Sequence, residues 1–482
     1  MTSERPIRLA VIGAGPGGYP AAFLAAEYGM DVTLIDPEEH PGGVCLYRGC
    51  IPSKALLHVA RLLRESHEAA AWGIRFGEPE IDLDALRDWK DRVVGRLVAG
   101  LGTLARQRKV EHIRGLARFR DAQTLHVRRD GELVEVGFDA AIVATGSLPL
   151  APGPLRVESP RVMDSTAALE LRDVPKTLLV VGGGYIGLEM ATVYSALGSE
   201  VTVVEMTSGL LPGADRDLVA PLSRRVEDGV AEVLLDTRVT SMEDVGDAVR
   251  VRLQPATGDE QERMVEKVLV AVGRAPNTAD LGLEHTGVRL DARGFIEVNA
   301  QRRTAEPSIY AVGDVAGQPM LAHKATHEAR VAVEAIAGRP SAFAPAAIPA
   351  VVYTDPEIAW CGLTELGARE QGIEVEVAKF PWTASGRATT LGRTEGVTKL
   401  ILERGTERVL GVGIVGTNAG ELIAEGVLAV EMGARATDVQ LAIHAHPTLA
   451  ETVMESAEVF FGQSPHYASR GRGGPASRGP IA

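Results

Sequence analysis

The chain has 482 residues, which is too long for one hydrophobic core, so we expect several domains. Apolar residues make up 45% of it and charged residues 24%, which is typical of a globular protein rather than a disordered one. The formal net charge of -14 argues against nucleic acid or an anionic membrane surface as the main partner.

The expected absence of targeting signals and the low number of cysteines point to a reducing compartment. No apolar stretch is long enough to span a bilayer, and residues 1–6 are polar and lead directly into a strand pattern. We therefore expect no transmembrane helix, no signal peptide and a cytoplasmic location. Three cysteines are too few for a secreted disulfide framework.

One strand–turn–helix pattern occurs twice. Residues 7–12 (IRLAVI) and 32–35 predict buried strands, separated by a glycine-rich turn and the apolar helix AAFLAAEYG. Residues 177–181 (TLLVV) and 201–204 repeat the pattern around the turn GGGYIG and the helix LEMATVYSALG. Asp36 lies 23 positions after Gly13, and Glu205 lies 23 positions after Gly182.

This spacing is typical of dinucleotide-binding α/β units. A helix N-terminus offers unpaired N–H groups and positive dipole charge to a pyrophosphate, and the acid accepts hydrogen bonds from ribose hydroxyls. The alternative is two glycine-rich turns without a ligand, which two complete fingerprints make the weaker reading. The glycines have three roles in each unit: the tight turn (Gly13, Gly182), close approach of the pyrophosphate (Gly15, Gly184) and helix–strand packing (Gly18, Gly187).

Two units predict two cofactors. Glu205 is followed by Met206 and not by an arginine that would receive a 2′-phosphate, so the second unit favours NAD over NADP. FAD is assigned to the first unit, because the paired cysteines follow it directly.

Cys45 and Cys50 precede the amphipathic helix KALLHVARLLRES, with Pro52 near its first turn. A thiolate is favoured at the positive end of a helix, and thiol–disulfide exchange needs one attacking and one resolving sulfur. The alternatives are a metal site, for which the usual ligand spacing is missing so that no metal is expected, or two unrelated buried cysteines. Cys361 stands alone in an apolar context and is interpreted as inert core.

A candidate base lies near the C-terminus, in the sequence HAHPTLAE. His446 suits the deprotonation of a dithiol, and Glu451 would orient its ring. Thr448 and Glu451 also match a capping box, in which the glutamate only satisfies a helix N-terminus. The residues alone leave these two roles for Glu451 open, while His444 is interpreted as structural.

The run GGVCLYRGCIPSK resembles the active-site segment of the disulfide-reducing flavoenzymes, most of all the dihydrolipoamide dehydrogenase family. The resemblance covers about residues 5 to 465 and includes ATGS at 144–147, VGRAPN at 272–277, AVGD at 311–314 and LAHKA at 321–325. It implies that Cys45 is the interchange thiol and Cys50 the thiol facing the flavin. Lys54 would lie near the flavin ring and pair with Glu189, and the match to the family's HPTxxE motif favours the His446–Glu451 dyad.

The resemblance also implies the cofactor contacts. Those of FAD are Gly13, Gly15, Gly18, Asp36, Lys54, Ala117, Gly146, Asp314 and Ala322. Those of NAD are Gly182, Gly184, Tyr185, Ile186, Gly187, Glu205, Val239, Ala271 and Gly273.

The implied fold is α/β, with two Rossmann-like dinucleotide-binding domains and a C-terminal α+β dimerisation domain. The expected divisions are 1–150 (FAD, first part), 151–275 (NAD), 276–347 (FAD and central, second part), 348–465 (interface) and 466–482 (disordered tail). Alternating segments at 348–362, 375–380 and 397–402, followed by two apolar helical stretches, fit the interface domain. The implied assembly is a homodimer in which His446 serves the partner's cysteines.

The implied activity is an NAD-dependent dehydrogenase that oxidises protein-bound dihydrolipoamide to lipoamide. Its partner would be a lipoyl-bearing acyltransferase subunit of a 2-oxo acid dehydrogenase complex or a glycine-cleavage carrier. A disulfide reductase like glutathione reductase is one rival, although Glu205 without an adjacent arginine argues against its NADPH preference. The other rival is a non-catalytic scaffold subunit.

Three positions depart from the family pattern. Tyr47 and Arg48 replace the usual Asn and Val between the cysteines. Arg48 would either favour the thiolate, in which case Arg48→Val makes the pair harder to reduce, or point to solvent. Tyr185 is either a flap over the flavin or a packed aromatic.

Overall fold

The computed structural model describes residues 5–468 and divides into two compact units. The first unit comprises residues 1–59, 76–173 and 270–344, and the second comprises residues 60–75, 174–269 and 345–482. The predicted tail falls largely outside the described residues, and the five-part division made from the sequence stays a prediction. Among the described residues, no helix combines the length and the apolarity needed to cross a membrane.

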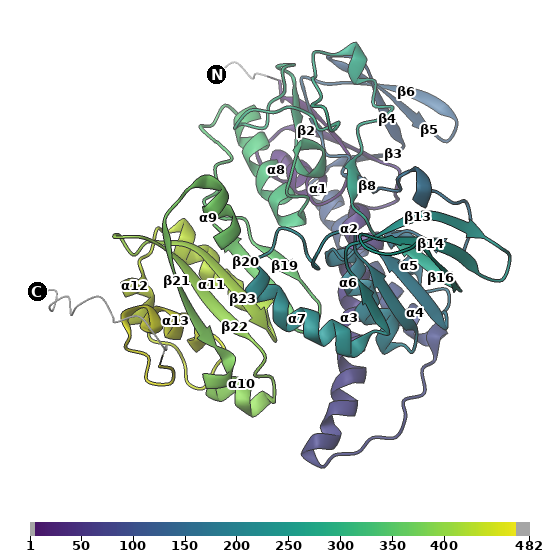
Figure 1. Ribbon diagram of the computed structural model, residues 1–482. Coiled ribbons are helices and arrows are strands. Elements are labelled where there is room, and N and C mark those ends of the chain that lie inside the picture. The colour runs from purple at the N-terminus through teal and green to yellow at the C-terminus, as the bar shows by residue number, and fades with distance from the viewer. Residues whose placement is uncertain (1–4, 469–482) are drawn as a thin grey trace, which may run out of the picture. The chain divides into compact units, whose positions relative to one another are not determined.

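A parallel five-stranded sheet organises the first unit (Figure 1). Its strands, in spatial order, are β18 (Ile309–Ala311), β7 (Ala140–Val143), β1 (Arg8–Ile12), β2 (Asp31–Asp36) and β3 (Glu111–Arg114). Pairing of β1 with β2 brings Ile12 opposite Ile35, so the glycine-rich turn and Asp36 emerge at the same edge. The predicted strands at 7–12 and 32–35 are confirmed.

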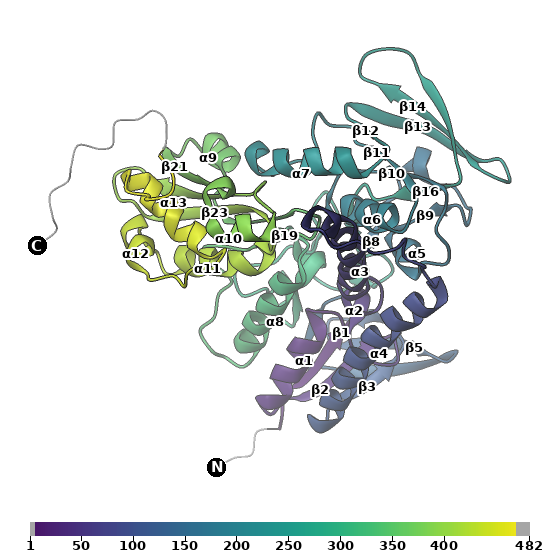
Figure 2. The same cartoon turned by 90° about the horizontal axis from the view of Figure 1, so that it is seen from below.

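Both faces of this sheet are buried, as expected for parallel strands whose crossover elements cover them. On one face, Leu9, Val11 and Leu34 pack against alanines of α1 (Gly18–Glu27) and α8 (Ala322–Ile336) (Figure 2). On the other face, Ala10 and Ile12 join the core formed with the antiparallel sheet of β4 (Leu116–Asp121), β5 (Thr124–Arg129) and β6 (Glu132–Gly137).

The remaining elements of the first unit connect this framework. They are α2 (Gly43–Arg48), α4 (Leu83–Gln107), α5 (Ser165–Glu170), β8 (Ser147–Pro149), β9 (Val162–Met163), β17 (Arg274–Pro276) and the short 3-10 helices η2 (Gly153–Leu155), η3 (Leu283–His285) and η4 (Gly313–Ala316). Helix α3 (Cys50–Glu68) begins in the first unit and is followed by η1 (Ala69–Trp72). Strands β8 and β17 pair antiparallel.

The second unit contains the repeat of the nucleotide-binding pattern. Its strands β12 (Glu232–Leu234), β11 (Glu200–Val204), β10 (Thr177–Val181) and β16 (Lys267–Val270) are neighbours in this order. Helix α6 (Tyr185–Ala196) follows β10 as predicted, and α7 (Arg216–Gly229) follows β11. An antiparallel sheet of β13 (Thr237–Asp244), β14 (Val249–Pro255) and β15 (Gln261–Val265), which was not predicted, completes this part.

The C-terminal part of the second unit is an antiparallel sheet with helices, which confirms the predicted α+β domain. Its strand order is β19 (Ala350–Val352), β20 (Glu357–Gly362), β23 (Val409–Gly416), β22 (Val397–Glu403) and β21 (Val375–Pro381). The helices are α9 (Glu365–Gln371), η5 (Trp382–Ala384), α10 (Gly386–Leu391), α11 (Ala419–Glu431), α12 (Ala436–Leu441) and α13 (Glu451–Phe461). Trp382, Leu400, Ile414 and Ile423 belong to its core.

Candidate functional site

The first glycine-rich turn has no room for side chains at two of its three fingerprint glycines, Gly13 and Gly18. Gly13 has φ +95°, and a Cβ there would lie 2.4 Å from the Ala144 carbonyl oxygen. A Cβ at Gly18 would lie 1.7 Å from the carbonyl oxygen of Gly13, so the start of the helix packs too closely against the turn for a side chain. A Cβ at Gly15 would meet only the Cα of Gly43, at 3.9 Å. The turn therefore fits a dinucleotide that approaches the backbone at Gly15.

Asp36, at the end of β2, holds this turn in place. Its Oδ2 accepts a hydrogen bond from Ala14 N at 2.7 Å, and its Oδ1 accepts one from Glu38 N at 2.9 Å. Burial raises the pKa of Asp36 and outweighs the opposing effect of these two bonds. Each carboxylate oxygen can accept a second bond, so the ribose contact stays a prediction alongside this structural role.

The second turn repeats the design. Gly182 has φ +112°. A Cβ at Gly187 would lie 2.0 Å from the carbonyl oxygen of Gly182, and nothing lies within 4 Å of a Cβ at Gly184. Glu205 Oε2 accepts from Gly183 N at 2.7 Å, while its Oε1 accepts from Thr207 N and Oγ1, both at 2.8 Å. The residues present thus fit a second dinucleotide.

Tyr185 and Ile186 open helix α6, directly after the second turn. The side chain of Tyr185 is 41% exposed, and both alternatives for it stay predictions. Deeper in the same helix, Glu189 is buried and its Oε1 accepts from Tyr353 N at 3.2 Å. The pairing of Glu189 with Lys54 stays a prediction.

The two cysteines come together at the junction of α2 and α3. The thiols of Cys45 and Cys50 are hydrogen-bonded, and this bond, followed by burial, raises the pKa of Cys45. Lys54, one turn into α3, acts in the opposite direction. Cys50 is the first residue of α3, where the helix dipole favours a thiolate. A Cβ at Gly49 would lie 2.9 Å from the Val44 carbonyl oxygen, so glycine is required between the helices.

Helix α2, which carries Cys45, contacts the first glycine-rich turn through its backbone. Gly42 N donates to the Ala14 carbonyl at 2.8 Å. Gly43 has φ +59°, and a Cβ there would lie 2.4 Å from the Cα of Gly15. The position of Cys45 is therefore set by the same turn that would hold the pyrophosphate.

Arg48, between the cysteines, does not extend alone into solvent. Its guanidinium forms an ion pair with Glu38, and it lies 5.9 Å from the centroid of the Tyr47 ring. The hydroxyl of Tyr47 donates to the His40 carbonyl at 3.0 Å. Of the two alternatives that the sequence left open, neither describes this arrangement fully.

The segment at 144–147 meets the segments at 272–277 and 311–314. Ser147 Oγ donates to Asp314 Oδ2 and receives a bond from Arg274 Nε at 2.7 Å. Thr145 Oγ1 donates to the Asn277 carbonyl at 2.7 Å. These motifs, distant in sequence, are thus brought to one place.

Sequence reasoning missed a buried ionic network behind Asp314. Glu328 is fully buried, and its Oε2 accepts from Gly313 N at 2.7 Å. Its Oε1 pairs with Lys324 Nζ at 3.0 Å and with Arg302 at 2.9 Å. Lys324 and Glu328 are four residues apart in α8, and this spacing of opposite charges among alanines was the available signal.

The other predicted cofactor positions are spread over several elements. Ala117 lies in β4, Val239 is buried in β13, Ala322 begins α8, and Ala271 and Gly273 follow β16. Gly146 has φ +73° and Gly273 has φ +136°, each with open space where a Cβ would be. Their contacts with FAD or NAD stay predictions.

His446 and Glu451 form a hydrogen-bonded pair. His446 Nδ1 lies 2.9 Å from Glu451 Oε1, and Glu451 Oε2 accepts from Thr448 N at 2.7 Å. The hydroxyl of Thr448 donates to the Ala445 carbonyl instead of capping α13, so the capping box is only half formed. The His446 side chain is 70% exposed, which presents Nε2 to an incoming group.

Two further predictions of inert residues are supported. His444 Nε2 lies 2.8 Å from Glu425 Oε1 and its Nδ1 lies 2.8 Å from the Ala442 carbonyl, in a side chain that is largely buried. Cys361 belongs to the core of the C-terminal sheet, and burial raises the pKa of its thiol to about 12.

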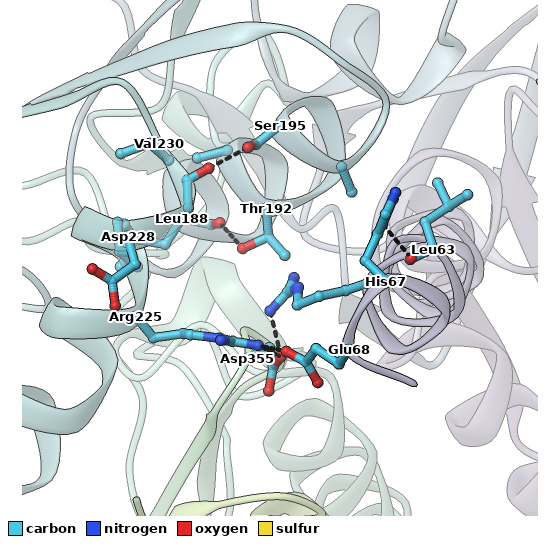
Figure 3. A pocket seen from close by; sticks show the side chains of 15 residues that line it. Leu63, His67, Glu68, Leu188, Thr192, Ser195, Arg225, Asp228, Val230 and Asp355 are labelled. Carbon is cyan, nitrogen blue, oxygen red and sulfur yellow. Dashed lines mark hydrogen bonds and ion pairs between the residues drawn. The ribbon is translucent and has the colours of Figure 1, made fainter. Parts of the chain in front are cut away.

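A pocket of about 320 Å³ lies in the second unit, lined by the second half of α3, helices α6 and α7, and Asp355 (Figure 3). Several of its charged side chains form ion pairs: Arg225 pairs with Glu68, and Arg64 pairs with Asp355, which also binds Arg393 from outside the lining. Burial alone would raise the pKa of Asp355, but the attraction of Arg393 and Arg64 outweighs it and leaves the pKa below its ordinary value.

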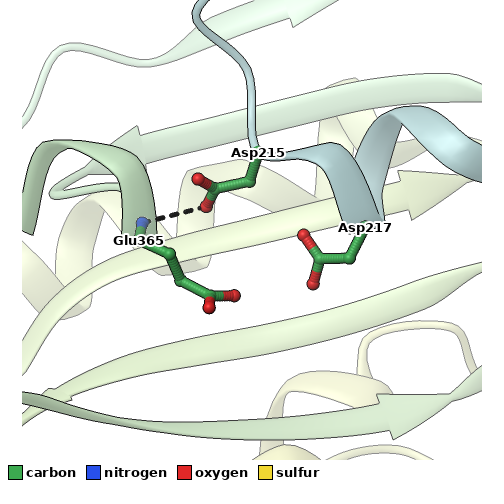
Figure 4. A group of neighbouring side chains, drawn as sticks. All are labelled: Asp215, Asp217 and Glu365. Carbon is green, nitrogen blue, oxygen red and sulfur yellow. Dashed lines mark hydrogen bonds between the residues drawn. The ribbon is translucent and has the colours of Figure 1, made fainter. Parts of the chain in front are cut away.

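Within residues 5–468, Asp215, Asp217 and Glu365 form a carboxylate cluster close enough to resemble a cation site (Figure 4). Lys399 Nζ lies 2.7 Å from Asp215, 2.7 Å from Asp217 and 2.9 Å from Glu365. The buried ammonium takes the place that a metal ion would need, so the cluster is a structural ion-pair network that joins α7, α9 and β22.

Comparisons with known proteins agree with this geometry. The family described as pyridine nucleotide-disulphide oxidoreductase matches residues 7–329, and its dimerisation domain matches residues 348–457. The chain is 50% identical to the dihydrolipoyl dehydrogenase of Haemophilus influenzae, over 96% of each chain. It is 48% identical to that of Vibrio cholerae, over 96% of this chain and 97% of the relative.

Solved structures show the same fold. LpdA from Mycobacterium tuberculosis is 27% identical with a TM-score of 0.86, covering 94% of this chain and 99% of that one. The Cu(II) complex of the HOCl-induced flavoprotein disulfide reductase RclA from Escherichia coli is 27% identical with a TM-score of 0.84, covering 95% and 100%.

Proposed function

The chain belongs to the pyridine nucleotide-disulphide oxidoreductase family, and from this premise we propose that it is an NAD-dependent dihydrolipoyl dehydrogenase. It oxidises a dihydrolipoyl group to the cyclic disulfide and uses FAD and NAD as cofactors. The observation that carries the proposal is the hydrogen-bonded Cys45–Cys50 pair, locked to a nucleotide-binding turn. The two relatives that are named dihydrolipoyl dehydrogenase match over nearly the whole chain.

The residues divide the chemistry as follows. His446 Nε2 takes a proton from the substrate dithiol, while Glu451 orients the ring and stabilises the imidazolium. The substrate thiolate attacks Cys45 Sγ, the Cys45–Cys50 disulfide breaks, and Cys50 leaves as a thiolate. The second substrate thiol then attacks the mixed disulfide, which closes the lipoyl ring and releases the Cys45 thiol. Bound flavin supplies the transfer of two electrons from the dithiol to NAD.

We further propose that two chains build each site. His446 is largely exposed although Glu451 holds its ring. Large apolar side chains of α11, its C-terminal end and the end of α12 are also exposed and need a cover: Leu428 (63%), Met432 (75%), Leu441 (74%) and Ile443 (100%). A second copy of the dimerisation domain is the cover that the family provides. The lipoyl group would come from an acyltransferase subunit or a glycine-cleavage carrier in the cytoplasm.

The test is anaerobic turnover of the purified flavoprotein with dihydrolipoamide and NAD. We expect NADH to form in wild type and to fall to background in Cys45→Ser, because no thiolate can form the mixed disulfide. Cys361→Ala is the matched control, since it removes a thiol that is buried elsewhere. Preferential turnover of glutathione disulfide with NADPH would favour the rival reductase, and full turnover in Cys45→Ser would rule the proposal out.

A further inference from the structure

Two contacts tie the last turn of α2 to the segment that follows strand β2. The Arg48 guanidinium pairs with the Glu38 carboxylate, and the Tyr47 hydroxyl donates to the His40 carbonyl at 3.0 Å. Both side chains of the ion pair are only partly exposed, Arg48 at 40% and Glu38 at 27%. Residues 47 and 48, which depart from the family pattern, therefore both face the same short segment.

That segment is itself anchored to the first nucleotide turn. Glu38 N donates to Asp36 Oδ1 at 2.9 Å, and Asp36 Oδ2 accepts from Ala14 N at 2.7 Å. A continuous series of contacts thus runs from the turn at Ala14, through Asp36 and Glu38, to Arg48 between the two cysteines. At the N-terminal end of α2, Gly42 and Gly43 contact the same turn through their backbones.

The charge of Arg48 is already balanced where it stands. Glu38 neutralises it directly. The positive charge that opposes the rise in the pKa of Cys45 belongs to Lys54 and not to Arg48. An arginine that acted as a thiolate stabiliser would need its charge directed at a sulfur and not at a carboxylate. The geometry therefore favours a mechanical role.

We propose that the Arg48–Glu38 pair is a clamp that holds α2 so that Cys45 stays in bonding position against Cys50. Arg48 is a positioning residue, and the proposal rests on the proposed function of the cysteine pair. A disulfide is favoured in proportion to the effective concentration of its two thiols, which depends on how firmly both are held. Loosening the clamp lowers that concentration and makes the disulfide easier to reduce.

The sign of this effect separates the clamp from an electrostatic role. If Arg48 stabilised the thiolate, Arg48→Val would make the pair harder to reduce and Glu38→Gln, which unmasks the arginine, would make it easier. If the pair is a clamp, both variants make it easier to reduce, each by about threefold to tenfold in the dithiol–disulfide equilibrium, where tenfold is about 30 mV. The charge-swapped variant Arg48→Glu/Glu38→Arg restores the clamp but reverses the charge between the cysteines.

The experiment is equilibration of the holoenzyme in glutathione redox buffers, followed by counting of reactive thiols. Arg404→Val removes an exposed ion pair with Glu374 elsewhere in the chain and is the matched control. FAD absorbance and the melting temperature confirm that each variant is folded. Wild-type turnover with dihydrolipoamide is measured separately, so that failure of the proposed function is distinguished from failure of the clamp.

We expect Arg48→Val and Glu38→Gln to shift in the same direction, and the charge swap to return within about twofold of wild type. Opposite shifts of the two single variants, or a charge swap that departs further than either of them, would assign Arg48 an electrostatic role. Unchanged equilibria in both single variants would also overturn the clamp.

Discussion

Glu451 shows how one side chain can meet two needs that the sequence presented as alternatives. One carboxylate oxygen faces His446 and the other accepts from the backbone of Thr448. Asp36 and Glu205 also divide their oxygens between donors of the chain, two for Asp36 and three for Glu205. The type of residue was predictable in each case, but the sequence does not state how many donors converge on one carboxylate.

The base assignment gives a prediction at the residue scale. His446→Gln should lower dihydrolipoamide oxidation by roughly 10²–10⁴-fold, because a general base contributes on that order. Oxidation of NADH by an artificial one-electron acceptor needs no dithiol and should be unaffected. His444→Gln is the control, since that ring pairs with Glu425, and turnover should stay within a few fold of wild type. Equal losses in both variants would contradict the assignment.

At the scale of elements, the sequence predicted well the two strand–turn–helix units and helix α3, which follows the cysteines. Gly13, Gly18 and Gly187 are required, because a Cβ at each would lie 1.7–2.4 Å from a backbone carbonyl oxygen, so the pattern itself encodes the turn. Strand β23 was missed because Gly411, Gly413 and Gly416 interrupt its pattern. The sheet of β13, β14 and β15 was missed although each strand pairs with the next one in sequence, and the alternation of apolar and charged residues in β14 was the available signal. The Glu328 network was missed because Arg302 and Gly313 approach it from outside α8.

The Glu328 network predicts a local loss of order. Glu328→Ala leaves Lys324 and Arg302 buried without their carboxylate, which costs about 3–5 kcal/mol for a buried pair. Because Gly313 and Asp314 are next to this network, we expect loss of bound FAD, measured by absorbance, and a lower melting temperature. Glu334→Ala in the same helix breaks the pair with Arg330, whose side chain is largely exposed, and should retain FAD. Normal FAD content in Glu328→Ala would count against the network's role.

At the scale of the whole molecule, buried ionic groups join elements that lie far apart in the chain. Asp355 pairs with Arg64 of α3 and with Arg393, and Lys399 of β22 joins the carboxylates before α7 and at α9. Such pairs fix which elements meet, and removing one partner leaves the others without compensation. Neither set carries a periodic pattern, which is why the sequence did not indicate them.

Asp355 predicts how stability depends on pH. Its pKa is lowered in the folded chain, so the ionised group stabilises the fold above the unfolded pKa of about 3.9, and this contribution is lost as pH falls through the folded value. Asp355→Asn should therefore lower the melting temperature by several degrees at pH 7. Below about pH 4, the melting temperatures of variant and wild type should move closer together. A difference that is constant across this range would show that ionisation of Asp355 is not responsible.

The backbone contact between Gly43 and Gly15 has a consequence for how this protein handles electrons. The sulfurs and the cradle for the nucleotide share one scaffold, and neither can be reshaped without disturbing the other. A substitution that reshapes the turn enough to release the prosthetic group would therefore also displace Cys45 from Cys50. Loss of the cofactor and loss of thiol alignment are expected to occur together.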